Sequence, residues 1–333
     1  MVLEVLEGGL LTTVQDLGRH GYEGYGVPVA GAMDAFALQA ANALVGNDLG
    51  EAGLELTVIG PRLRATEGCL LGLAGADLGC VLDGQPLAPW RSYWLPAGAT
   101  LSFGGPRSGC RTYLAVAGGV DLPLVLGSRS TYLRGGFGGY KGRALRAGDV
   151  LALSAPAGRR LASPSAARFL ALTYGDEPVV RVLLGPQADR FTAAGMATFL
   201  DSTYEVSGDS DRMGSRLKGP RIEHTRGPDV ISDGIALGSV QVPGDGQPIV
   251  MLADRQTTGG YTKIATVIDA DIQLLAQCLP GASRVRFQAV DLDEAVRLRG
   301  AQAAQLTLLA GPRAYNLYDV APADGECLPG GQE

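Results

Sequence analysis

A run of hydrogen-bonding side chains separates two apolar segments at "ADRQTTGGYTKIA", residues 253–265. Amides, hydroxyls and a lysine around one glycine turn can fix a carbonyl or carboxyl group and stabilise developing negative charge. The spacing therefore predicts one wall of a binding site, and a solvated hairpin is the alternative. The candidate residues are Gln256, Thr257, Tyr261 and Lys263 from this stretch, and Gln241 from the glycine turn before it.

A second polar stretch, residues 207–229, concentrates positive charge in an otherwise acidic chain. The planar guanidinium of arginine suits carboxylates and phosphates. Arg212 and Arg216 are therefore candidates for binding an acidic group. The alternative is an exposed face of local ion pairs, each of which contributes about 0–1 kcal/mol.

A third stretch near the N-terminus, "GLLTTVQDLGRHGYEGYG", places polar residues where an apolar run gives way to a glycine-rich loop. Loops positioned by a rigid strand carry many functional residues. The candidates here are Gln15, Asp16 and Arg19. Local pairing of Asp16 with Arg19, which would only fix the turn, is the alternative.

Nucleotide-loop, cysteine and metal chemistry have little support in the sequence. The glycine-rich segment "RGGFGGYKGR", residues 134–143, lacks the nucleotide-loop spacing, because Lys141 is followed by Gly142 rather than by Ser or Thr. Only two histidines are present, and the five cysteines are scattered, so we expect buried thiols and no metal site. The cysteines are Cys69, Cys80, Cys110, Cys278 and Cys327.

Bulk properties restrict the class of protein. A chain of 333 residues exceeds one core of typical size, so we expect two domains, residues 1–155 and 156–333, divided near the Pro/Ala/Ser-rich segment 154–169. The formal net charge of -6 argues against a nucleic-acid partner, since phosphates require a basic surface. Without a membrane-length apolar stretch or a leader-like N-terminus, we expect no membrane partner and a cytoplasmic location.

The elements that must position these residues are mostly strands. Short β-branched and aliphatic segments recur between glycine, proline and aspartate residues, and 49 glycines are spread along the chain. Apolar periodicity predicts only three helices, over residues 32–46, 189–202 and 291–311. A mostly β chain with few helices favours barrels or sandwiches over a doubly wound sheet.

Taken with their flanks, these stretches resemble the biotin-dependent carboxyltransferase family. The family includes the C subunit of bacterial 5-oxoprolinase (KipA-like proteins) and part of the carboxyltransferase region of urea carboxylase. The resemblance implies two cyclophilin-like β-barrel modules. It rests on "GLLTTVQDLGRHGYEGYGVPVAGAMD", "ANALVGN", "LELTVIGPRL", "GSRSTYLRGGFGGYKGRAL", "SDRMGSRLKGP" and "DGIALGSVQVPGDGQPIVMLADRQTTGGYTKIATVI", in this order.

The resemblance implies an ATP-dependent amide (lactam) hydrolase that works as a hetero-oligomeric complex of several subunits. The complex would open 5-oxo-L-proline to L-glutamate. The partners of this chain would be a KipI-like B subunit together with a third, the A subunit. We expect the chain to be inactive alone, and its sequence contains no recognisable ATP loop.

Two alternatives follow from the same resemblance. One is carboxyl transfer from carboxybiotin to a urea-like or amide nitrogen. No lysine here has the biotin-attachment context, so a partner would carry the biotin. The other is a KipA-like regulatory antagonist of a KipI-like partner.

With the family in view, the candidate residues receive expected roles. Lys263 and Arg212 would bind the substrate carboxylate or a transferring anion, while Gln256, Thr257 and Tyr261 would orient the amide. Asp16 and Arg19 would contribute from the first half. The expected catalytic residues are Lys263 and Asp16, and the expected substrate-binding residues are Arg212, Arg216, Gln256, Thr257, Tyr261, Gln241, Gln15 and Arg19.

Overall fold

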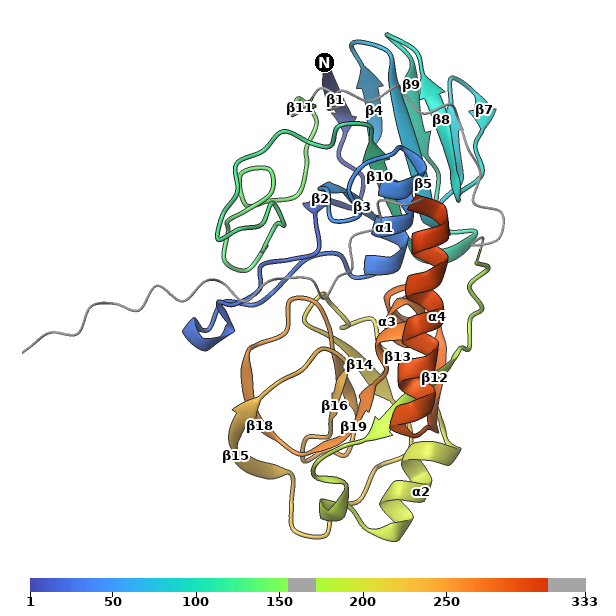
Figure 1. Cartoon of the computed structure of the whole chain (residues 1–333). Helices are drawn as coiled ribbons and strands as arrows, with labels where there is room; N and C mark the ends of the chain where they lie inside the picture. Colours follow the sequence, from blue (N-terminus) through green and yellow to red (C-terminus); the bar gives the residue numbers. More distant parts are fainter. Residues whose placement is uncertain (155–171, 311–333) are drawn as a thin grey trace, which may run out of the picture.

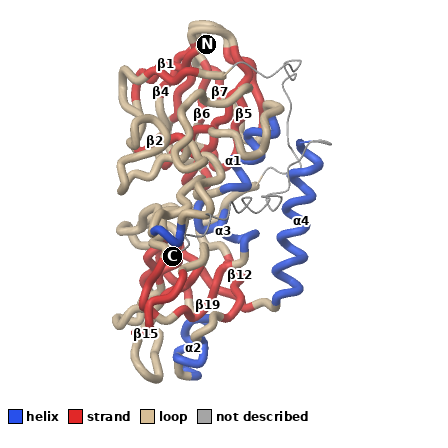
Figure 2. The backbone as a smooth tube through the Cα atoms, turned by 60° about the vertical axis from the view of Figure 1, so that its left-hand side comes forward, coloured by secondary structure: helices blue, strands red, loops and turns tan. Residues whose placement is uncertain are grey.

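The computed structural model describes residues 1–154 and 172–310, which we call the first and second halves. The predicted boundary segment, residues 154–169, lies outside the described residues except for residue 154. The two halves form separate groups of strands, one above the other in Figures 1 and 2, with helix α4 (Leu292–Ala310) beside both. The division at residue 155 stays a prediction.

The first half contains two sheets, with strand orders β11-β1-β4-β9-β6-β7 and β2-β3-β10-β5-β8. A core that includes Leu3, Leu54, Leu71 and Leu101 packs between them. The strands are β1 (Val2–Glu7), β2 (Leu11–Gln15), β3 (Gly53–Thr57), β4 (Arg62–Ala65), β5 (Cys69–Asp77), β6 (Cys80–Leu82), β7 (Gln85–Pro86), β8 (Arg91–Leu95), β9 (Thr100–Phe103), β10 (Ser108–Val116) and β11 (Val150–Ala152).

Strand β5 is buried along almost its whole length because both of its faces are covered. Leu71 and Leu73 face the core between the sheets, whereas Leu70 and Ala74 pack with helix α1 (Ala35–Leu44). At Gly72 a Cβ atom would lie 2.4 Å from the carbonyl oxygen of Ala41 in α1. The glycine therefore allows the helix to approach the sheet closely.

The second half is a closed barrel with strand order β12-β19-β16-β17-β14-β13-β20. Its core includes Val182, Phe199, Tyr204, Val250 and Phe287. A separate two-stranded antiparallel sheet of β15 and β18 lies beside the barrel (Figure 1). The strands are β12 (Val179–Leu184), β13 (Thr203–Val206), β14 (Gly214–Lys218), β15 (Asp229–Gly234), β16 (Ser239–Gln241), β17 (Ile249–Met251), β18 (Thr258–Tyr261), β19 (Lys263–Val267) and β20 (Arg284–Ala289).

The mostly β architecture is confirmed, and so is a barrel in the second half. In the first half the strands form two sheets instead of the closed barrel that the resemblance implied. The sheets do not close because β2 and β8 are the edge strands of one sheet, and β11 and the two-residue strand β7 are the edge strands of the other.

The three predicted helices are present as α1, α2 (Ala193–Asp201) and α4, and two 3₁₀ turns, η1 (Glu23–Tyr25) and η2 (Ala188–Arg190), accompany them. The sequence did not predict α3 (Asp269–Ala276), which continues the apolar run of β19. An ion pair of 2.5 Å between Arg181 and Asp271 ties α3 to β12. No helix of the described part is long and apolar enough to cross a membrane. The buried thiols are confirmed for Cys69, Cys80, Cys110 and Cys278, and Cys327 lies outside the described residues.

Gln277, at the end of α3, connects the second half to the first. Its Oε1 accepts hydrogen bonds from the backbone N–H groups of Cys110 and Arg111, at 3.0 and 2.9 Å. Its Nε2 donates to Asp34 Oδ2 at 2.8 Å and to the Arg111 carbonyl at 2.9 Å. Arg111 in turn donates to the Ala276 carbonyl. The halves are therefore joined by buried, hydrogen-bonded polar groups.

Asp34 caps α1 inside this contact, and burial raises its pKa to about 6 although Gln277 and Ala37 donate to it. A carboxyl with a raised folded-state pKa stabilises the fold most below about pH 4, and this contribution is lost as pH rises through about 6. The free energy of unfolding of the wild type minus that of Asp34→Asn is therefore expected to fall by about 2 kcal/mol from about pH 4 to 7. Urea unfolding of both proteins across this range measures the difference, and a pH-independent value would contradict the prediction.

Candidate functional site

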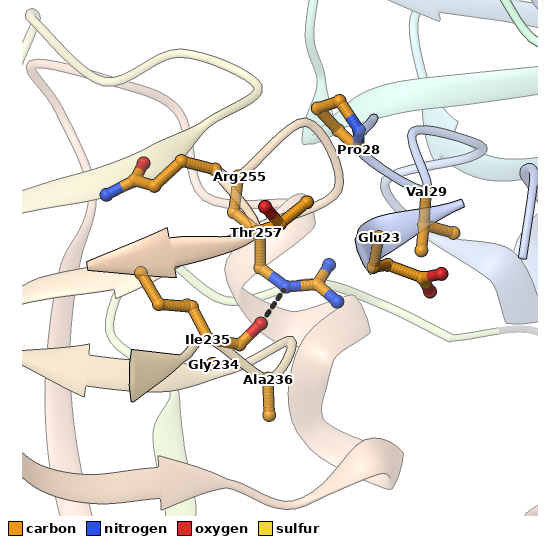
Figure 3. A pocket seen from close by; sticks show the side chains of 9 residues that line it. Glu23, Pro28, Val29, Gly234, Ile235, Ala236, Arg255 and Thr257 are labelled. Carbon is orange, nitrogen blue, oxygen red and sulfur yellow. Dashed lines mark hydrogen bonds between the residues drawn. The ribbon is translucent and has the colours of Figure 1, made fainter. Parts of the chain in front are cut away.

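A cleft of about 400 Å³ opens between the two halves (Figure 3). One wall comes from the loop around η1, and the other comes from the end of β15 and the turn after β17. The cleft therefore brings together the N-terminal polar stretch and the stretch at residues 253–265. It is lined by Glu23, Pro28, Val29, Gly234, Ile235, Ala236, Arg255, Gln256 and Thr257.

Arg255 is the principal positive group of this cleft. Its Nε donates to the Ile235 carbonyl at 2.9 Å, and its Nη1 donates to the Leu252 carbonyl at 3.4 Å. Burial lowers the pKa of this guanidinium, and the charge of Glu23 partly opposes the shift. Figure 3 shows the guanidinium pointing toward Glu23 across the cleft. The site thus presents a cation and a carboxylate from opposite halves of the chain.

Neither Arg255 nor Glu23 was among the predicted site residues. Arg255 stands inside the polar stretch at residues 253–265, but the sequence does not show that its side chain turns into a cleft. Glu23 is 232 positions away from Arg255 and comes close only through the packing of the two halves. Of the predicted residues, Gln256 and Thr257 line the cleft.

Lys263 lies behind one wall of the cleft. Its buried ammonium donates to Asp233 Oδ2 at 2.8 Å and to the carbonyl of Gly234, a lining residue, at 3.3 Å. Gln241 pairs with Lys263 in the register of β16 and β19. The Gln241 Nε2 atom is buried without a hydrogen-bond partner in the described part of the chain. Lys263 therefore supports the wall that carries Gly234, and Gln241 lies beside Lys263 on the neighbouring strand.

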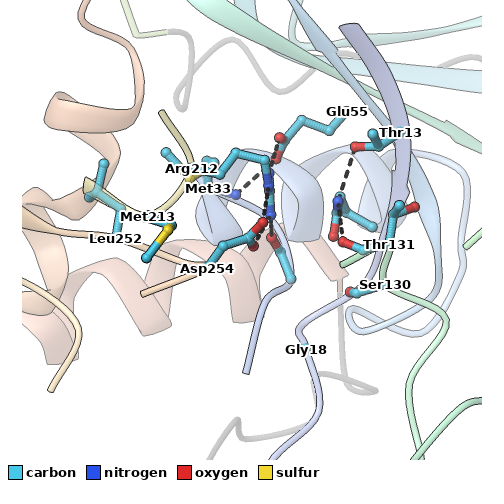
Figure 4. A network of polar contacts seen from close by, with 12 residues as sticks. Thr13, Gly18, Met33, Glu55, Ser130, Thr131, Arg212, Met213, Leu252 and Asp254 are labelled. Atoms are coloured by element: carbon cyan, nitrogen blue, oxygen red, sulfur yellow. Dashed lines mark hydrogen bonds and ion pairs between the residues drawn. The ribbon is translucent and has the colours of Figure 1, made fainter. Parts of the chain in front are cut away.

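Arg212 lies between the halves, and protein acceptors surround it (Figure 4). Its Nε and Nη2 donate to Asp254 at 3.1 and 3.0 Å, its Nη1 pairs with Glu55, and its Nη2 also donates to the Gly31 carbonyl. We call these four residues the joint. Because two carboxylates already neutralise Arg212, this geometry fits a link between the halves better than the predicted binding of a substrate carboxylate.

The electrostatics of the joint follow from burial and pairing. Burial alone would lower the pKa of Arg212, but Glu55 and Asp254 raise it above its ordinary value. Burial raises the pKa of Glu55, but the charges of Arg212 and Arg111 and the hydrogen bonds from Met33 and Tyr113 together depress it below its usual range. For Asp254 burial prevails over the neighbouring Arg212, and the pKa is raised. The Arg212 guanidinium is therefore the largest of the influences that keep Glu55 ionised inside the protein.

Asp16 holds a loop of the first half. Its Oδ1 accepts from the Gly18 N–H at 2.8 Å, from Ser128 Oγ at 2.7 Å and from Ser130 Oγ, and its Oδ2 accepts from the Arg129 N–H at 2.6 Å. Each carboxylate oxygen thus already has a donor. This arrangement fits the alternative interpretation, in which Asp16 fixes a turn, although its partners are the loop at 128–130 and not Arg19.

Arg19 and Gln15 belong to the same buried region, part of which Figure 4 shows beside the joint. Arg19 donates to the Ser130 carbonyl, and its guanidinium lies 5.0 Å from the centre of the Phe137 ring. Burial lowers the pKa of Arg19. Gln15 donates to Thr13 Oγ1 at 3.0 Å and to the Thr131 carbonyl at 3.3 Å. Neither residue lines the cleft.

Arg216 and Tyr261 are both exposed. Arg216 is on β14 of the barrel, and Tyr261 is at the end of β18 with 42% of its surface accessible. Neither lines the cleft. The predicted site residues therefore fall into three groups: the cleft and its supporting wall, the buried contacts between and within the halves, and the surface.

Residues 25–289 match the family model described as carboxyltransferase domain, subdomain A and B. The chain belongs to this family. All the cleft residues of this carboxyltransferase-domain chain except Glu23 fall within the match. Glu23 lies two positions before it.

Individual relatives of this carboxyltransferase-domain chain are similar over nearly its whole length. It is 40% identical over 312 residues to the 5-oxoprolinase C subunit of Escherichia coli (strain K12), covering 93% of this chain and 98% of that protein. It is 37% identical to the 5-oxoprolinase C subunit of Haemophilus influenzae, covering 90% and 94%. The crystal structure of Kluyveromyces lactis urea carboxylase superposes with a TM-score of 0.87 at 31% identity, but the match covers 96% of this chain and only 30% of that one.

Proposed function

We propose that this chain is the C subunit of an ATP-dependent 5-oxoprolinase, which opens the lactam ring of 5-oxo-L-proline to give L-glutamate. The observation that carries the proposal is the 40% identity to a protein of that name, with 98% of its length covered. The two chains therefore correspond over nearly their whole lengths, whereas the chain spans only 30% of the urea carboxylase. A cytoplasmic location belongs to the same proposal.

Ring opening in this complex requires activation of a stable amide. In the reaction we propose, the γ-phosphoryl group of ATP transfers to the lactam carbonyl oxygen and ADP leaves. Water then attacks the same carbon, the ring C–N bond breaks with protonation of the nitrogen, and phosphate is released. The cleft would hold the lactam and limit the access of water to it.

Other subunits complete this reaction. The two relatives are named as subunits, which supports an assembly of several different chains. We assign the partner roles to a KipI-like B subunit together with a third, the A subunit. The complex would use ATP, and its site is not located in this chain, whose glycine-rich loop at residues 134–143 lacks the nucleotide-loop spacing.

Carboxyl transfer is a second candidate, and the structural match to urea carboxylase favours it. In that reaction a partner's carboxybiotin would deliver its carboxyl group to an amide or urea-like nitrogen held in the same cleft. The chain would then bind a biotinylated partner and carry no biotin itself.

Substrate dependence separates the two candidates. The assembled subunits are expected to form glutamate and ADP in equal amounts with 5-oxo-L-proline, without bicarbonate and without inhibition by avidin. They are expected to release no ADP with urea and bicarbonate. Turnover that needs bicarbonate and is blocked by avidin would instead establish carboxyl transfer.

A further inference from the structure

Arg255 and Glu23 line the cleft from opposite halves of the chain, and the Arg255 guanidinium points toward Glu23 (Figure 3). We propose that they form a two-point clamp for a small acid whose carboxylate adjoins an N–H donor: Arg255 binds the carboxylate and Glu23 accepts the N–H. The inference rests on the proposed function, because 5-oxo-L-proline is the acid that we assign to the cleft.

The setting of Arg255 suits the recognition of a carboxylate. Its hydrogen bonds to the carbonyls of Ile235 and Leu252 fix the guanidinium and leave N–H donors directed into the cleft. Within the described residues no carboxylate forms an ion pair with Arg255, in contrast to Arg212. A fixed guanidinium with free N–H groups binds a carboxylate through two parallel hydrogen bonds. Burial lowers the pKa of Arg255 because it disfavours the charged guanidinium. An anionic ligand would stabilise that charge.

Glu23 is held by its own loop. Its Oε2 accepts from the Gly21 N–H at 2.8 Å, and no described residue donates to its Oε1. Oε1 is therefore the oxygen available to a ligand N–H. A carboxylate acceptor also disfavours a second acidic group at this position, because like charges repel.

The carboxylate and the lactam N–H of 5-oxo-L-proline match the two partners, Arg255 and Glu23. The carbon that bears its carboxylate is bonded directly to the lactam nitrogen, so the anion and the N–H donor are neighbours. The remaining ring atoms are methylene groups and the carbonyl. Pro28, Val29 and Ile235 supply apolar walls for the methylene groups, and a cleft of about 400 Å³ has room for this small ring.

Ligands that lack one of the two groups provide the test. The assembled complex, without ATP, is titrated calorimetrically with 5-oxo-L-proline, with 2-pyrrolidinone, which lacks the carboxylate, and with N-methyl-5-oxoproline, which lacks the N–H. Loss of one charge-assisted hydrogen bond is expected to weaken binding about 10- to 100-fold for each analogue.

Substitutions assign each preference to its residue. Arg255→Met is expected to abolish the preference for 5-oxo-L-proline over 2-pyrrolidinone, and Arg255→Lys to retain part of it. Glu23→Met is expected to abolish only the preference for 5-oxo-L-proline over N-methyl-5-oxoproline. Arg284→Met, an exposed arginine on β20, is the matched control and should bind like the wild type. Urea unfolding of each variant checks that it is folded.

Turnover of 5-oxo-L-proline by the wild-type complex is measured in parallel. If the wild type turns over the substrate while folded variants keep both preferences, the clamp is wrong and the proposed function stands. If the wild type neither binds nor turns over 5-oxo-L-proline, both are wrong.

Discussion

Replacing Arg212 by methionine is expected to lower the free energy of unfolding by about 3–5 kcal/mol. The substitution leaves the carboxylates of Glu55 and Asp254 without their counter-charge, and these side chains are only 1% and 2% exposed. A buried charge whose partner is removed cannot recover its hydration, so it destabilises more than the pair had stabilised. Equilibrium urea unfolding at neutral pH measures the loss.

Two further variants show whether the joint causes this loss. Arg284→Met removes an exposed arginine and is expected to change the free energy of unfolding by less than about 0.5 kcal/mol. Combining Arg212→Met with Glu55→Gln and Asp254→Asn removes the stranded charges and should recover more than half of the loss. If Arg212→Met were no more destabilising than Arg284→Met, Arg212 would be available for the substrate, as the sequence first indicated.

Lys263→Met is expected to lower kcat/KM of the assembled enzyme about 100-fold with little effect on folding. The ammonium ties β19 to Asp233 and Gly234, and Gly234 lines the cleft. A displacement of about 1 Å in a group that positions a substrate can reduce the rate about 100-fold. Stability should change by only about 0–1 kcal/mol, because Asp233 is 62% exposed and can be hydrated. Steady-state kinetics and urea unfolding of the same preparation separate the two effects.

Two other substitutions make this prediction specific to Lys263. Lys263→Arg, which keeps a donor near Asp233 and Gly234, should recover part of the activity. Lys218→Met alters an exposed lysine of β14 and should leave kcat/KM unchanged. Wild-type turnover by Lys263→Met would show that the wall at Gly234 does not require this lysine. That result would favour a regulatory role for the chain, since an antagonist of a partner does not need an ordered cleft.

Local patterns in the sequence predicted the mostly β fold and three of its four described helices. Apolar periodicity predicted α1 and α2, although both helices begin later than predicted, after the side-chain caps Asp34 and Thr192. Helix α3 was missed because its apolar residues continue those of β19, and its anchor, the ion pair of Asp271 with Arg181, joins residues 90 positions apart. The closure of one set of strands and the separation of the other into two sheets depend on such distant pairings, which spacing does not show.

The candidate site was predictable in its residue types and less so in its contacts. Gln256 and Thr257 line the cleft, as the polar turn had indicated. Arg212 was noticed for its charge, but its neutralising partner Glu55 is 157 positions away. Arg255 was not predicted as a site residue. A single arginine in a polar turn is ordinarily solvated, whereas the Arg255 side chain lies in the cleft. Burial and pairing, which the sequence does not reveal, distinguish these two arginines.

The most direct test of the account is 5-oxoproline-dependent ADP release by the purified A and B subunits, with and without this chain. The Escherichia coli C subunit, to which the chain is 40% identical, serves as the positive control for a competent mixture. We predict ADP release in the presence of this chain and none in its absence. Equal release without the chain, or no release with it where the positive control is active, would contradict the assignment.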